Sequence, residues 1–102
     1  MIWIEDGREH LFQWDLDRRL VVDSAEVTEI HYHTSNKEKD LRCEVFEDNG
    51  KRVANIPNIL LQKSGNFRVY AYNNGYTGEQ KIFEIKARCK PEDYIYTETE
   101  VI

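Results

Sequence analysis

Apolar and polar residues alternate with period two through the second half of the chain. In the stretch LRCEV, Leu41, Cys43 and Val45 fall on one side of an extended backbone, and Arg42 and Glu44 fall on the other. In FRVYAYN and IFEIKAR the apolar positions are Phe67, Val69, Ala71, Phe83, Ile85 and Ala87. The opposite side carries Arg68, Tyr70, Tyr72, Glu84, Lys86 and Arg88. This alternation is typical of antiparallel strands with one buried and one solvent-exposed face. It places Phe67, Val69, Phe83 and Ile85 at the centre of the core.

Turn signals separate the strand-like stretches. Asp48-Asn49-Gly50 predicts a tight hairpin, because Asn and Gly tolerate the positive φ that such turns require. Residues 73–78 predict a longer loop between two strands. Earlier strands are expected at about 10–14, 19–22 and 26–33, so turns recur about every 8–12 residues, which is the spacing of sandwiches and barrels.

The stretch IPNILLQKSGN breaks the alternation. Pro57 stands where a helix can begin and Gly65 where one can end. Three successive apolar residues, 59–61, favour one buried helical turn, with Leu60 or Leu61 capping the core. We interpret 57–62 as a short turn that crosses between sheets. The predicted fold is an all-β, immunoglobulin-like antiparallel sandwich of about seven to eight strands that lacks the antibody-type disulfide spacing.

Composition and charge exclude several function classes. The chain has 102 residues, enough for one domain, and a formal net charge of −5. Its Lys and Arg residues form no basic stripe, so we expect no nucleic-acid partner. No apolar run approaches the roughly 20 residues of a membrane helix, so we expect no membrane contact. The start MIWIEDGREH carries acids where a signal peptide has basic residues, which predicts synthesis in the cytoplasm.

Two cysteines are too few for a disulfide framework. Cys43 and Cys89 both lie within alternating patterns, so we expect both thiols to be reduced and buried on inward strand faces. The residues do not exclude a pairing between them.

Candidate chemistry is sparse. His31 and His33 share one strand face with Glu29, an arrangement that can place two imidazoles on one metal ion, but a further ligand is needed. We therefore predict solvated histidines and no metal. Three acids, Asp6, Asp15 and Asp17, are interpreted as surface carboxylates that balance Arg18 and Arg19. No nucleophile elbow, phosphate-binding glycine loop or zinc-type cysteine pair appears, so we expect no enzyme activity, catalytic residue or cofactor.

Exposed tyrosines are the candidate interaction residues. Tyr70 and Tyr72 lie on the outer face of one strand, and Tyr76 follows in the next loop. Tyrosine is common at protein interfaces, and exposed aromatic rings also stack on sugars. A protein interface is the leading interpretation, and a small carbohydrate-binding module is the alternative.

Two stretches carry a resemblance to a known family. PNILLQKSGNFRVYAYNNG and IFEIKARCKPEDYIYTETEVI resemble an N-terminal domain of baseplate upper proteins and minor tail proteins from phages of Gram-positive hosts. In that family the matching pattern is P-N-x-L-L-Q-x-x-G-x-x-x-V-Y-x-Y, followed by R-x-K-P-x-D-Y-x-Y-T-x-T-E. The resemblance covers residues 53–102 well and residues 1–52 only in general layout.

The resemblance implies a structural role in the virion. Such domains attach a distal fibre or receptor-binding region, contact other virion proteins and assemble as homo-oligomers. They are made in the host cytoplasm and end in the phage tail, and any host-surface glycan is bound by the attached region. The family supplies no catalytic residues.

The last segment is expected to leave the domain. We predict a β-sandwich over 1–90 and an extended C-terminal linker or exit strand over 91–102, because Pro91 cannot donate to a sheet ladder. Tyr94 and Tyr96 are expected to dock on this domain or on a neighbouring copy, since an unpaired apolar edge invites association. Residues 97–102 are expected to lead outward.

Overall fold

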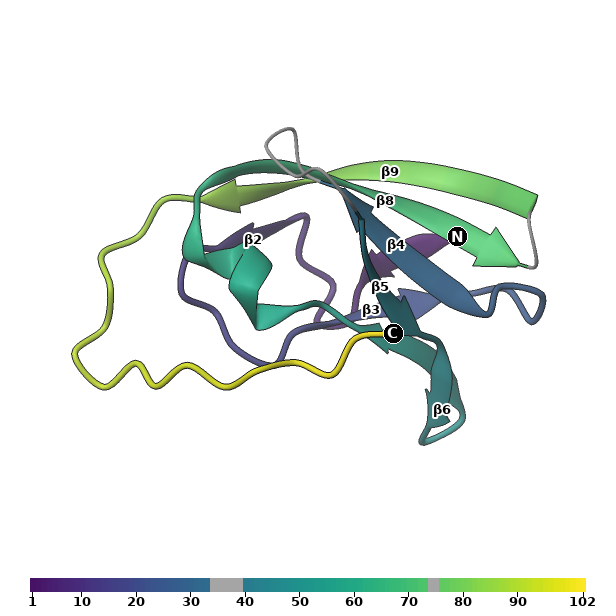
Figure 1. The fold of residues 1–102 in the computed structure, drawn as a ribbon, viewed down its shortest axis with the longest axis horizontal. Coiled ribbons are helices and arrows are strands. Elements are labelled where there is room, and N and C mark those ends of the chain that lie inside the picture. Colours follow the sequence, from purple (N-terminus) through teal and green to yellow (C-terminus); the bar gives the residue numbers. More distant parts are fainter. Residues whose placement is uncertain (34–39, 74–75) are drawn as a thin grey trace.

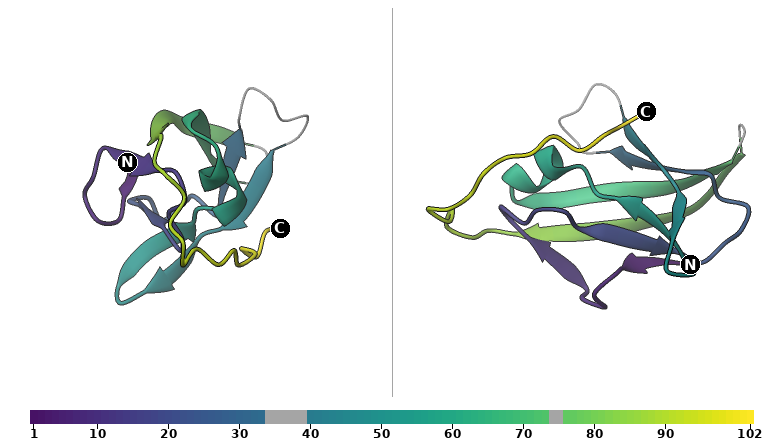
Figure 2. Two further views of the ribbon diagram at one scale, coloured as in Figure 1. Left: turned by 90° about the vertical axis from the view of Figure 1, so that its left-hand side faces the viewer. Right: turned by 90° about the horizontal axis from the view of Figure 1, so that it is seen from below.

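The computed structural model describes residues 1–33, 40–73 and 76–102, and this part of the chain folds as two packed β-sheets. The first sheet has the order β1-β3-β7-β6, and its strands are β1 (Ile2–Ile4), β3 (Arg19–Val22), β7 (Lys51–Asn55) and β6 (Phe46–Asp48). The second has the order β2-β9-β8-β4-β5, and its strands are β2 (His10–Phe12), β9 (Tyr76–Lys86), β8 (Gly65–Asn73), β4 (Glu29–His33) and β5 (Leu41–Glu44). Figures 1 and 2 show the two layers facing each other.

This strand order confirms the predicted immunoglobulin-like sandwich. The first sheet follows the A-B-E-D order of that fold, and β9, β8 and β4 take the places of strands G, F and C. Two details differ from the prediction. The described residues form nine strands, and β2 pairs with β9 in parallel, with Leu11 opposite Ile85. The expected strand 10–14 ends at Phe12, and the expected strand 26–33 begins at Glu29.

The predicted turns are present. β6 and β7 form a hairpin in which Asn49 and Gly50 have φ of 52° and 76°. The turn expected at 57–62 is the 3-10 helix η1 (Asn58–Gln62), which carries the chain from β7 in one sheet to β8 in the other. Pairing of Asn73 with Tyr76 makes the connection between β8 and β9 shorter than the predicted loop, and residues 74–75 lie outside the described part.

The inward faces of the two sheets form one core. Phe67 stacks on Phe83 with ring centroids 5.7 Å apart, and Val69, Ile85, Leu60 and Leu61 are buried around them, as predicted. Tyr32 is a buried aromatic residue of β4. Its hydroxyl donates a 2.6 Å hydrogen bond to the Asn55 carbonyl and so links the two sheets.

Cys43 is buried and Cys89 is exposed, and both thiols are free. The burial prediction is therefore confirmed for Cys43 and wrong for Cys89. It is also wrong for Ala87, which is exposed. The reason is that β9 ends at Lys86, so the alternation of inward and outward positions stops there although the sequence pattern continues.

Candidate functional site

The C-terminal segment, residues 91–102, contains no strand but lies against the sandwich. It leaves the end of β9, turns back at that end of the molecule and runs past η1 towards β5 (yellow in Figures 1 and 2). Side chains of the sandwich hold it at several points. We call these side chains and their partners the clasp: Trp14, Asn58 and Gln62 on the sandwich, and Tyr94, Thr97 and Thr99 on the segment.

Asn58 makes most of the contacts in the clasp. It opens η1, and its side chain is 1% exposed. Its Nδ2 donates to the carbonyl oxygen of Thr97 at 2.9 Å and to Thr97 Oγ1 at 3.2 Å. Its backbone N–H donates to Thr99 Oγ1 at 2.9 Å, and its Oδ1 accepts from the Asp17 N–H at 2.9 Å. A buried amide must find partners for its donors and acceptor, and here Thr97 of the segment and Asp17 of the sandwich provide them.

Tyr94 provides the second point of attachment. Its ring meets that of Trp14 edge-on, with centroids 5.2 Å apart, and its hydroxyl accepts a 3.3 Å hydrogen bond from Gln62 Nε2. The ammonium of Lys90 lies 5.3 Å from the Trp14 ring centroid and 5.5 Å from that of Tyr94. This confirms the prediction that Tyr94 docks, and the partner is its own domain. Ile95 and Tyr96 are exposed.

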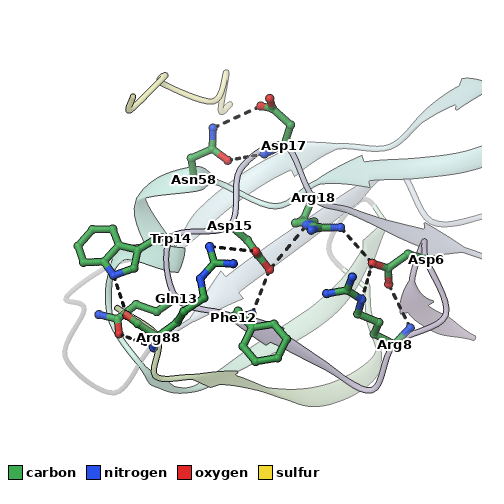
Figure 3. A network of polar contacts seen from close by, with 10 residues as sticks. All are labelled: Asp6, Arg8, Phe12, Gln13, Trp14, Asp15, Asp17, Arg18, Asn58 and Arg88. Atoms are coloured by element: carbon green, nitrogen blue, oxygen red, sulfur yellow. Dashed lines mark hydrogen bonds and ion pairs between the residues drawn. The ribbon is translucent and has the colours of Figure 1, made fainter. Parts of the chain in front are cut away.

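The chain between β9 and the clasp is also held in place. Gln13 donates from its backbone N–H to the Lys86 carbonyl, and its Oε1 accepts from the Arg88 N–H at 3.3 Å. The indole Nε1 of Trp14 donates to the Arg88 carbonyl at 3.0 Å (Figure 3). The direction in which the chain leaves β9 is therefore set by the loop that follows β2.

A buried carboxylate stabilises that loop. Asp15 is 5% exposed, and its Oδ2 accepts a 3.0 Å hydrogen bond from the Phe12 N–H. Its oxygens lie 3.5 Å from Arg88 Nη2 and 3.6 Å from Arg18 Nε, so it stands between two guanidinium groups (Figure 3). Trp14 in the same loop has the unusual φ of 72°. These contacts keep Trp14 in the position where it meets Tyr94.

The prediction that Asp6, Asp15 and Asp17 are surface carboxylates is therefore wrong for Asp15, which is buried. Its partner Arg88 is 73 residues away in the sequence, so no local pattern shows the burial. Asp6 does pair at the surface, with Arg8 and Arg18, and Asp17 binds Asn58 (Figure 3). Arg19 pairs instead with Glu5 and Asp48, and the hydrogen bonds that it donates to these carboxylates raise the pKa of its guanidinium.

The end of the segment reaches the outer edge of β5. Cys43 Sγ donates to the Glu100 carbonyl at 3.8 Å, and the Ile102 N–H donates to the Arg42 carbonyl at 2.9 Å. Burial raises the pKa of the Cys43 thiol to about 11. The prediction that residues 97–102 lead outward is therefore wrong, because Asn58 and Cys43 donate hydrogen bonds to the segment and the Arg42 carbonyl accepts one from it.

The other candidate interaction residues are spread over the second sheet. Tyr70 and Tyr72 point away from the core, as predicted, and both are half-buried. The Tyr72 ring stacks on the His31 ring with centroids 4.5 Å apart, which covers one face of the tyrosine. Tyr76 is the first residue of β9, and its side chain lies outside the described part of the structure.

The histidines of β4 are paired with carboxylates. His31 Nε2 lies 2.8 Å from Glu29 Oε2, and His33 Nδ1 lies 2.9 Å from Asp40 Oδ1. Among the residues described, no group of three or more His, Cys, Asp or Glu side chains is arranged to hold a metal ion. Nor does this part of the chain contain a helix with the length and apolar character to cross a membrane.

The comparisons with known proteins assign no family. No protein-family model matches the chain, and comparisons with curated proteins and with solved structures find no match either.

Proposed function

We propose that this domain is a structural module of a phage tail or baseplate, which attaches a distal fibre or receptor-binding region to the virion through protein–protein contacts. The observation that carries the proposal is the clasp. Asn58 and Gln62 come from the first stretch that resembles the phage domains, and Tyr94, Thr97 and Thr99 come from the second. The two halves of the resemblance therefore contact each other.

Such a clasp suits an attachment role. A module that carries another region needs a defined direction at the point where the chain leaves it. Here Gln13 and Trp14 bind the backbone at Arg88. Asn58 binds the backbone at Thr97 and the hydroxyl of Thr99. Rigid secondary structure on one side and a clamped segment on the other hold an attached region better than a free linker does.

The segment also offers surface for neighbouring chains. Its exposed apolar side chains are Ile95, Tyr96, Val101 and Ile102, and Phe46 of β6 is 40% exposed beside the last two. Aromatic and aliphatic side chains of this kind form the centres of protein interfaces. We propose that they contact other copies of this chain and other virion proteins in the assembled tail.

The carbohydrate-binding alternative has less support. A sugar stacks on a ring whose face is free, and one face of Tyr72 is covered by His31. The half-buried Tyr70 stands opposite His31 in β4 and Gln80 in β9, so Tyr70 and Tyr72 do not form a flat row of free rings.

Labelling of particles tests the proposal. Antibodies against residues 1–102 should place immunogold at the tail end of phage particles purified from the source culture, and the protein should appear in the peptide mass spectra of those particles. Antibodies pre-absorbed with the domain are the control. A protein that stays entirely in the soluble fraction, with unlabelled tails, would refute the virion role.

A further inference from the structure

The C-terminal segment is held by polar contacts once it has passed Tyr94. We call residues 95–102 the strap. Its apolar side chains are exposed: Ile95 by 73%, Val101 by 42% and Ile102 by 54%. The contacts that fasten it are hydrogen bonds from Asn58, Cys43 and the Ile102 N–H. The hydrophobic core of the described residues includes no residue of the strap.

The strap covers groups that belong to the sandwich. Cys43 is 2% exposed, and its Sγ faces the Glu100 carbonyl. The Arg42 carbonyl on the outer edge of β5 accepts from Ile102. Figure 2 shows the strap passing across the sandwich towards its end near β5. Removal of the strap would take away the Glu100 carbonyl that faces Cys43 Sγ and the Ile102 N–H bound to the Arg42 carbonyl, while the two sheets would keep all of their pairing.

We infer that the strap opens and closes as a unit while Tyr94 and the sandwich stay folded, and that opening uncovers the Cys43 thiol and the outer edge of β5. Segments with few buried apolar contacts open locally at much lower free energy than the whole domain unfolds. Ordering eight extended residues costs backbone entropy, and a few neutral hydrogen bonds exceed that cost by only a small margin, so the closed strap is favoured but opens readily. The inference concerns the motion of the segment and does not rest on the phage role.

Thiol labelling tests the inference, because the chain carries its own reference. Cys89 is exposed and should react with Ellman's reagent in a fast phase, whereas Cys43 should react in a slow phase limited by opening. Opening of the strap exposes little surface, so the slow rate should change little in low urea. A slow rate that rises as steeply with urea as global unfolding does would overturn the inference.

A pair of matched variants identifies the contacts involved. Asn58→Ala removes the two hydrogen bonds to Thr97 and also those between Asn58 and Asp17 within the sandwich. Each bond to Thr97 is worth roughly a two- to tenfold shift in the opening equilibrium of the strap, so Cys43 should react on the order of tenfold faster. Asn66→Ala makes the same change at an exposed position and should leave the rate unchanged. Equal slow rates in the two variants would contradict the inference.

A third variant covers the case in which Asn58→Ala does not fold. Thr99→Val keeps the side-chain shape but removes the hydroxyl that accepts from the Asn58 N–H. Because Thr99 lies on the strap, the sandwich core is untouched. Cys43 should then react about threefold faster or more, with the urea midpoint of the sandwich nearly unchanged. An unaltered rate would show that the strap does not open through this contact.

Discussion

Asp15→Asn tests whether the buried carboxylate stabilises the end of the sandwich from which the C-terminal segment leaves. The substitution keeps the size of the side chain and one oxygen that can accept from the Phe12 N–H. It removes the negative charge that lies 3.5 Å from Arg88 and 3.6 Å from Arg18. Arg18 Nε is buried and has no hydrogen-bond partner among the described residues, so after the substitution only Asp6, which pairs with Arg18 Nη1, offsets the charge of this guanidinium.

The expected cost follows from the exposure of the two partners. Removing one member of a fully buried ion pair costs about 3–5 kcal/mol. The side chains of Arg18 and Arg88 are 31% and 39% exposed, so water screens part of the interaction. We therefore expect Asp15→Asn to lower the free energy of unfolding by about 1–3 kcal/mol. For a domain of this size each kcal/mol lowers Tm by about 4–8 °C.

Urea unfolding followed by tryptophan fluorescence and by circular dichroism measures this change. The matched control is Asp93→Asn, because Asp93 is exposed and its carboxylate makes no hydrogen bond or ion pair with the described residues. The control should stay within about 0.5 kcal/mol of the parent. If Asp15→Asn did so too, the carboxylate would be solvated and would not stabilise the loop.

Three further predictions concern the core, the alkaline range and the outer face. Phe83→Ala removes a ring that is 3% exposed and should cost about 3–5 kcal/mol in urea unfolding, and a loss below about 1 kcal/mol would mean that its face is not buried. Burial raises the pKa of Tyr32 above 10.0 and that of Cys43 from 9.0 to about 11. The unfolded chain therefore loses these two protons at a lower pH than the folded domain does. The free energy of unfolding should be constant below pH 9 and should fall as the pH rises above it. The fall should be less steep in Tyr32→Phe. Urea unfolding curves that do not change up to pH 11 would contradict this prediction. On a glycan array the domain should show no specific binding, whereas micromolar binding lost in Tyr70→Ala or Tyr72→Ala would favour the carbohydrate-binding alternative over the tail module.

The buried and exposed faces of the strands could be predicted from the sequence, because successive side chains in a strand point to opposite faces. Phe67, Val69, Phe83 and Ile85 alternate with polar residues, and the structure buries all four. The Asn49-Gly50 turn could be predicted for a similar reason, since the required φ values restrict which residues can adopt them. Both inferences use only interactions between near neighbours in the chain.

Features that depend on distant partners could not be predicted in this way. The alternation of IFEIKAR continues past the last residue of β9, so it predicts inward positions for Ala87 and Cys89, whereas both are exposed. The burial of Asp15 depends on Arg88, and the parallel pairing of β2 depends on β9. None of these pairs leaves a periodic trace in the sequence.

The sequence does contain a signal for the clasp, but it lies in two polar residues and not in the alternation of apolar and polar positions. Asn58 and Gln62 flank the apolar residues of a short turn that was expected to be buried. A buried amide needs partners for its donors and acceptor, and the hydroxyls and carbonyls of an extended segment rich in Thr can provide them. Counting the hydrogen bonds that Asn58 requires would have indicated a second, polar segment packed on the turn.

The polar character of these contacts explains how one segment can both bind its own domain and offer apolar side chains to others. Thr97 and Thr99 are two residues apart, so in an extended chain they lie on the same side, and Asn58 binds both. This fixes the backbone without using the apolar side chains at positions 95, 101 and 102, which are exposed. A segment packed through those side chains would have lost them as contact surface. Because the hydrogen bonds hold only the backbone and hydroxyl groups, a neighbouring chain could bind the apolar side chains without first detaching the segment.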